Sequence, residues 1–186
     1  MRLCIADPPY LGRANRWYGS GCGHGKGQGK ADYHPNAQLW DRPETHQELV
    51  RELERDFDGW AIAMSVHSLS TYLSVIETDS RNGIRVLSWI KPKAVPSGSR
   101  IKTSWEPVLV RIPKERKGYD IGVKTNDYLI ADVENKGFIG AKPEAWTHWL
   151  LDVLGYQQGD EVVDMFQGSN AVQLAIASYP LRHARD

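Results

Sequence analysis

The chain has 186 residues, 41% of them hydrophobic and 25% charged, a composition that predicts one folded domain over residues 1–186. Its 23 basic and 23 acidic residues cancel, which argues against a nucleic-acid binder because such proteins usually carry a basic excess. With no apolar run near the ~20 residues of a membrane span, no signal-peptide core and only two cysteines, we expect a cytoplasmic protein without membrane contact.

Strand and helix patterns alternate along the chain. A strand is predicted at Arg2–Ala6, followed at 11–42 by a mobile loop in which six glycines alternate with other residues. Helices are predicted at Glu44–Phe57, Leu69–Ile76, Pro143–Leu154 and near Ala171–Ser178, and further strands at Trp60–Val66, Arg85–Ile90, Glu106–Ile112 and Glu161–Phe166. This alternation predicts an α/β fold with a mostly parallel sheet.

Charge is distributed unevenly along the chain. Residues 81–117 carry ten basic and two acidic residues, whereas residues 31–80 carry three basic and ten acidic ones. Because a ligand meets one face rather than the average charge, the basic block has two interpretations. It is either an anion-binding or nucleic-acid-binding face, or an ordinary solvated surface.

The first loop whose residues suit binding or catalysis is Asp7-Pro8-Pro9-Tyr10, which directly follows the first predicted strand. Two prolines hold the backbone extended and present carbonyl oxygens without competing N–H donors. The Asp7 carboxylate and a carbonyl can accept both hydrogens of an exocyclic amino group, while Tyr10 stacks on the ring that bears it. The alternative is an ordinary turn at the end of a strand.

The second such loop is the segment 164–170, which links a predicted strand to a helix. Gly168 allows a close backbone approach, and the helix N-terminus offers free N–H groups. These features suit a nucleoside cofactor that carries a carboxylate, although a generic strand–turn–helix connection has the same pattern.

Five segments follow one another in an informative order, namely Asp7–Tyr10, Val86–Pro92, Trp105–Val110, Lys142-Pro143 with its helix, and Gly159–Ser169. In this order the chain resembles the β-class amino methyltransferases, permuted enzymes that transfer a methyl group from S-adenosylmethionine to adenine N6 or cytosine N4 in DNA. The resemblance implies a circularly permuted, Rossmann-like methyltransferase fold. Aspartate at the first motif position favours adenine, flipped out of double-stranded DNA, as the substrate.

The resemblance also assigns roles to residues. The catalytic set is Asp7, Pro8, Pro9 and Tyr10. The cofactor set is Ala6, Asp7, Lys142, Pro143, Asp164, Phe166, Gly168, Ser169 and Asn170. Phosphate contacts are expected from the basic region within 91–137, a possible target-recognition region, and from the Gly-rich loop, with the set Lys91, Lys93, Arg100, Lys102, Lys114, Arg116, Lys117, Lys26 and Lys30.

Two departures from the family bear on these expectations. Asn170 stands where relatives usually have a glycine, and asparagine tolerates the left-handed conformation better than most residues. Relatives usually continue with a further strand whose acid binds the ribose, so we expect a sheet shortened at the cofactor-side edge. That exposed edge favours a homo-oligomer.

Several alternatives stay open at this stage. The target is alternatively cytosine N4 in DNA or an adenine in RNA, and the protein is alternatively an inactive nucleic-acid-binding subunit. Cys22, His24 and His34 match no zinc spacing, so no metal is expected. Trp146 and Trp149 are interpreted as core residues rather than cofactor contacts, and Glu106 as a residue that orients neighbouring backbone.

Overall fold

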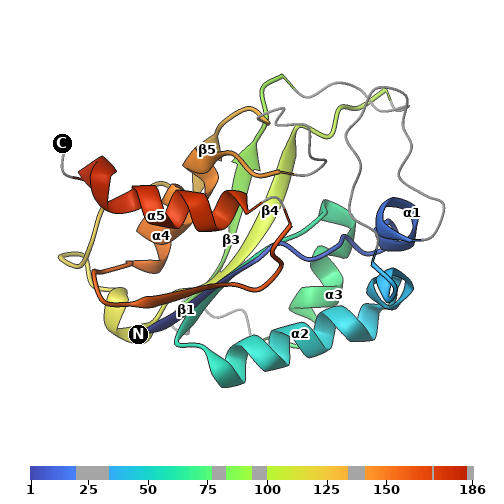
Figure 1. Ribbon diagram of the computed structural model, residues 1–186, viewed down its shortest axis with the longest axis horizontal. Coiled ribbons are helices and arrows are strands. Elements are labelled where there is room, and N and C mark those ends of the chain that lie inside the picture. Colours follow the sequence, from blue (N-terminus) through green and yellow to red (C-terminus); the bar gives the residue numbers. More distant parts are fainter. Residues whose placement is uncertain (20–33, 77–82, 94–99, 134–140, 169, 184–186) are drawn as a thin grey trace.

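The computed structural model describes residues 1–19, 34–76, 83–93, 100–133, 141–168 and 170–183, with side chains placed through Tyr179 (Figure 1). Its strands are β1 (Arg2–Ala6), β2 (Gly59–Ala63), β3 (Ile84–Ile90), β4 (Trp105–Arg111), β5 (Tyr128–Ile130) and β6 (Glu161–Asp164). The α-helices are α1 (Ala14–Tyr18), α2 (Pro43–Asp56), α3 (Leu69–Leu73), α4 (Glu144–Leu154) and α5 (Ala171–His183). Short 3-10 turns are η1 (Ala37–Asp41), η2 (Val66–Ser68) and η4 (Lys114–Arg116).

The six strands form one mixed sheet in the order β5-β3-β4-β2-β1-β6. β1 pairs in parallel with β2 and β6, and β3 pairs in parallel with β5, whereas β4 runs antiparallel between β2 and β3. The predicted α/β class with a mostly parallel sheet is therefore confirmed. The loops that follow β1, β3 and β6 consequently lie at the same end of the sheet.

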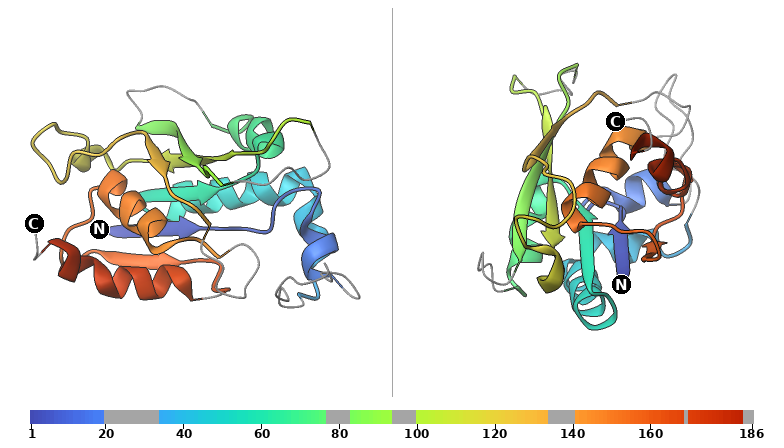
Figure 2. Two further views of the ribbon diagram at one scale, coloured as in Figure 1. Left: turned by 90° about the horizontal axis from the view of Figure 1, so that it is seen from above. Right: turned by 90° about the vertical axis from the view of Figure 1, so that its left-hand side faces the viewer.

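Helices cover both faces of the sheet (Figure 2). On one face α4 and α5 pack on Leu3 and Ile5 of β1, and on the other α2 and α3 pack on Cys4 and Ala6. The alternation follows from the strand geometry, because successive side chains point to opposite faces. β1 is thereby buried on both sides and fixes the position of the loop that follows it.

The helix ends explain why the chain turns where it does. Pro43 occupies the first turn of α2, where its missing N–H costs no intrahelical bond. Gly155 ends α4 with φ 68°, the left-handed conformation that glycine adopts without steric strain. Both α2 and α4 begin within one residue of their predicted starts, and no described helix is long and apolar enough to cross a membrane.

The structure departs from the sequence expectation in two segments. The range 11–42 contains α1 and η1, where we expected only a mobile loop, and residues 20–33 of that range lie outside the described residues. Asp41 holds α1 in place, since its carboxylate accepts hydrogen bonds from the N–H groups of Ala14 and Asn15. The polar stretch after η4 contains β5, a three-residue strand too short to show alternation.

Candidate active site

A cleft of about 530 Å³ lies at the end of the sheet where β1 and β6 finish. Both loops predicted to carry chemistry line it, the first after β1 and the second after β6. From the predicted catalytic and cofactor sets, the lining residues are Asp7, Pro8, Pro9, Tyr10, Lys142, Asp164, Phe166, Gly168 and Asn170. The structure thus brings together in one cavity two motifs separated by more than 150 residues of sequence.

A buried ion pair lies at the centre of this cleft. Lys142 Nζ is 2.8 Å from each oxygen of the Asp7 carboxylate, and the Lys142 side chain is only 6% exposed. Three aromatic rings surround the same ammonium group, with centroids 5.4 to 5.7 Å away, namely Tyr10, Trp89 and Trp146. Such cation–π contacts stabilise a charge that has left water.

A second pair of charges lies beside the first. The Tyr10 hydroxyl donates a hydrogen bond of 2.7 Å to Glu106 Oε2, and the Lys91 ammonium pairs with Oε1 of the same carboxylate. The Tyr10 hydroxyl also lies 3.4 Å from Lys142 Nζ. Two carboxylates, two ammonium groups and one phenol therefore form one network along the cleft wall.

Burial and neighbouring charge shift the acid–base properties of this network. Burial raises the pKa of Asp7 although Lys142 opposes the shift. Burial also acts on Glu106, but the two lysines outweigh it and hold the pKa of Glu106 below its ordinary value. The pKa of Lys142 is raised because the attraction of Asp7 and Glu106 exceeds the cost of burial, so Lys142 remains an ammonium group at neutral pH.

Asp164 adds an unused acceptor to the same cleft. Asp164 ends β6 and is buried, and its Oδ1 has no hydrogen-bond partner among the described residues. Burial raises the pKa of Asp164, whereas a hydrogen bond from the Phe166 backbone lowers it. An unpaired buried oxygen is costly, so it fits a ligand that donates an amino or hydroxyl hydrogen there.

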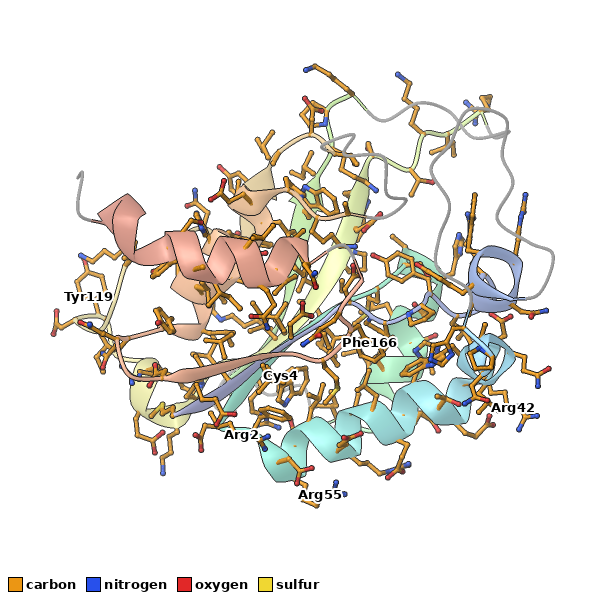
Figure 3. All side chains as sticks on the ribbon, viewed as in Figure 1. Arg2, Cys4, Arg42, Arg55, Tyr119 and Phe166 are labelled. Atoms are coloured by element: carbon orange, nitrogen blue, oxygen red, sulfur yellow. The ribbon has the colours of Figure 1, made fainter. Side chains whose placement is uncertain are left out.

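The loop after Asp164 also lines the cleft. Asn170 adopts φ 57°, so the expected left-handed conformation at this position is confirmed. Gly168 also lines the cleft, while Ser169 lies outside the described residues. Phe166, labelled in Figure 3, packs edge-on against Trp40 with ring centroids 5.0 Å apart, which closes the cleft floor toward η1.

Two residues of the predicted cofactor set contribute to the frame and do not line the cleft. Ala6 is fully buried at the end of β1. Pro143 precedes α4 and accepts the backbone hydrogen bond from Trp146 that starts the helix. Trp146 and Trp149 pack in the core beneath the sheet, as the sequence interpretation held.

The basic block divides between opposite ends of the sheet, contrary to a single phosphate-binding face. Lys93 is exposed after β3, and Arg100 and Lys102 are exposed before β4, all at the end where the cleft lies. The cluster Lys114–Lys117 follows β4 at the other end, because β4 runs antiparallel to its neighbours. Figure 3 labels Tyr119, just beyond this cluster, at the opposite end of the molecule from Arg42 near α1.

Two members of the predicted phosphate-binding set are mostly buried in ion pairs, whereas Lys93 pairs with Asp132 but stays exposed. Lys91 is mostly buried against Glu106, and Arg116 is mostly buried against Asp160, which also binds the N-terminal amine. Neither is a free surface cation, so both expectations are corrected. Lys26 and Lys30 lie outside the described residues.

The structure adds cleft residues that the sequence did not single out. Trp17 and Tyr18 belong to α1, Arg13 directly precedes it, and His34 and Trp89 line the cleft as well. A five-residue helix is too short to show periodicity, so these aromatic side chains appeared to belong to a loop. Glu106, expected to orient backbone, instead contacts two side chains of the site.

Nothing in the described part of the chain groups three potential metal ligands together. Cys22 and His24 lie outside that part, while His34 lines the cleft. We therefore assign no metal site to the described residues of the cleft.

Comparison with known proteins identifies the fold. No family model and no curated protein matches the sequence. Among solved structures, the crystal structure of M1.HpyAVI matches with a TM-score of 0.51 and 16% identity, over 96% of this chain and 76% of that one. The M1.HpyAVI-SAM complex matches with a TM-score of 0.57 and 17% identity, over 96% and 77% of the two chains. The chain therefore shares the α/β fold of these two structures.

Proposed function

We propose that the protein is an S-adenosylmethionine-dependent methyltransferase that acts on the N6 amino group of adenine in double-stranded DNA. The observation that carries this proposal is one cleft lined both by Asp7-Pro8-Pro9-Tyr10 and by Asp164, one oxygen of which has no hydrogen-bond partner among the described residues. The first group suits a planar base with an amino group, and the second suits a cofactor with hydrogen-bond donors. The fold shared with a structure solved with SAM supports the same assignment.

The cofactor end would be formed by the loop after β6. Asp164 Oδ1 would accept a hydrogen bond from the cofactor, and Gly168 and Asn170 would let the backbone approach it closely. Lys142 would add a positive charge for a carboxylate. When bound, S-adenosylmethionine supplies a methyl group on a sulfonium, which is electrophilic enough to need no covalent enzyme intermediate.

The base end would position and activate the amino group. The Asp7 carboxylate and the Pro8 carbonyl would accept its two hydrogens, and Tyr10 would stack on the ring. Acceptance of both hydrogens stabilises the positive charge that develops on nitrogen. Lys142 opposes the effect of burial on the pKa of Asp7 and so favours its carboxylate form, which would also take up the proton that the methylated nitrogen releases.

A base in duplex DNA must leave the stack to enter the cleft, at a cost of a few kcal/mol. Lys93, Arg100 and Lys102 lie exposed at the cleft end and would contact phosphates. Because each phosphate contact releases counterions, DNA affinity should fall steeply with salt, and a flat response would contradict this part of the proposal. Lys114, exposed at the other end of the sheet, offers a matched control, since charge reversal there should leave the salt dependence almost unchanged.

The experiment that tests the function identifies the methylated product. Three separate reactions each contain the protein and S-adenosylmethionine. One adds an adenine-containing duplex, one an adenine-free duplex and one an adenine-containing RNA. The nucleic acid is then digested, and its nucleosides are analysed by mass spectrometry. N6-methyladenine from the duplex alone would support the proposal. N4-methylcytosine, or methyladenine from RNA alone, would instead support one of the two alternative targets.

An inactive nucleic-acid-binding subunit is the alternative from another class. Calorimetric titration with S-adenosylmethionine separates it from an enzyme, because a subunit that has lost cofactor binding gives no heat at high cofactor concentration. Asn170 adopts the left-handed conformation that a glycine would supply, so this departure from the family pattern gives no structural reason for lost binding.

A further inference from the structure

The hydroxyl of Tyr10 is anchored by a strand far from it in sequence. Tyr10 follows β1, whereas its hydrogen-bond acceptor, Glu106, lies on β4, 96 residues later. Glu106 is paired in register with Trp89 of β3, and Lys91 follows that strand directly. The anchor is thus built on two adjacent strands of the sheet, which are among the most rigid elements of a fold.

Both oxygens of Glu106 are already engaged by side chains of the site. Oε2 accepts the hydrogen bond from Tyr10, and Oε1 pairs with the Lys91 ammonium. The side chains of Lys91 and Glu106 are only 12% and 18% exposed, so water competes little for these contacts. A base in the cleft would compete with Tyr10 and Lys91 for these oxygens, so the contacts favour a role for Glu106 that acts through Tyr10.

The Tyr10 ring is fixed at both ends by this arrangement. Its backbone follows Pro8 and Pro9, whose rings restrict the chain, and its hydroxyl is held by Glu106 at 2.7 Å. A hydroxyl held in this way fixes the direction of the ring axis and limits rotation about the Cα–Cβ bond, so the ring is kept beside the cleft before a planar partner arrives. Holding a contacting group in place before the ligand arrives is an established source of rate and affinity.

We propose that Glu106, held in turn by Lys91, is a positioning residue that fixes the Tyr10 ring as a stacking platform for the target base. The inference deepens the proposed function and rests on it. It also explains why a phenol suits this position, since phenylalanine would supply the ring without the anchor.

A double-mutant cycle tests the coupling between the two residues. Tyr10→Phe and Glu106→Ala should each lower kcat/KM for methyl transfer by roughly 10- to 100-fold, the range expected for loss of a hydrogen bond to a charged acceptor. The kcat/KM of the double variant should lie within about threefold of that of the less active single variant, because both changes remove the same interaction. The cofactor dissociation constant should stay unchanged, and Glu48→Gln, an exposed acid on α2, is the matched control.

Multiplicative losses in the double variant would overturn the proposal, since Glu106 would then act independently of Tyr10. Glu106→Gln is the control for a folding defect in Glu106→Ala, because its amide oxygen can still accept the Tyr10 hydrogen bond. It should retain more activity than Glu106→Ala, and equal losses in the two variants would count against the anchor. Absence of methyl transfer by the wild-type protein would overturn the proposed function, and this role of Glu106 with it.

A spectroscopic measurement tests the contact without activity. With ¹³Cζ-labelled tyrosine, the protein should give signals from its eight tyrosines, and Tyr10→Phe identifies the Tyr10 signal by its loss. Glu106→Ala should shift that signal, and Glu48→Gln should not. An unchanged Tyr10 signal in Glu106→Ala would overturn the anchor even if the enzyme is active.

Discussion

The Asp7–Lys142 ion pair should be coupled energetically, and a double-mutant cycle of protein stability measures the coupling. Lys142 Nζ contacts both Asp7 oxygens at 2.8 Å, and the two side chains are 6% and 23% exposed, in that order. Removing one partner of a buried pair typically costs ~3–5 kcal/mol because the other charge stays buried without compensation. The charge left behind, Lys142, keeps its three aromatic rings and the attraction of Glu106, so we expect Asp7→Ala to cost about 3 kcal/mol, the lower end of that range.

The double variant Asp7→Ala with Lys142→Met removes both charges, so its cost should fall below the sum of the single costs by about 2 kcal/mol. At ~2–4 °C per kcal/mol for a domain of this size, Asp7→Ala alone should lower Tm by about 6–12 °C. Urea unfolding of the four proteins, followed by circular dichroism, gives the coupling. Costs that add within about 0.5 kcal/mol would refute the claim that the pair acts as a unit.

Three further predictions follow from single residues. Asn170 has φ 57°, so Asn170→Gly should preserve stability whereas Asn170→Val should cost about 1–2 kcal/mol in urea unfolding; equal stabilities would contradict this. Burial raises the pKa of Asp7 despite Lys142, so methyl transfer should decline on the acid side at a pH above the ordinary aspartate range, as protonation removes the acceptor; a pH–rate profile that stays flat to about pH 4 would oppose it. Burial raises the pKa of Cys4 to about 12, so peptide mass spectrometry should show Cys4 unmodified by a thiol reagent at pH 8 and modified in urea; rapid labelling of the folded protein would disagree.

The sequence was sufficient for the elements that carry a local signal. Arg2–Ala6 is apolar and ends at two prolines, so both its strand character and its end could be predicted. Gly155 marked the end of α4 because only a left-handed residue fits there. The two chemical loops were found for the same reason, since each directly follows an apolar strand.

Contacts between distant residues could not be predicted in this way. Lys142 binds a carboxylate 135 positions away, and Glu106 binds a hydroxyl 96 positions away, so neither pairing leaves a local pattern. The prediction of one phosphate-binding face was wrong for a related reason. Strand β4 lies within the basic block and crosses the sheet, so the residues before it and after it lie at opposite ends. Lys91 and Arg116 were counted as surface cations although acids elsewhere in the chain neutralise them.

Transfer of a labelled methyl group from S-adenosylmethionine to an adenine-containing duplex, compared between the wild-type protein and Asp7→Ala, tests the central claim most directly. The expected result is N6-methyladenine from the wild-type protein and none from Asp7→Ala, although both bind the cofactor in calorimetric titration. Full transfer by Asp7→Ala, or no transfer by a wild-type protein that binds both cofactor and DNA, would contradict the assignment of this cleft as an amino methyltransferase site.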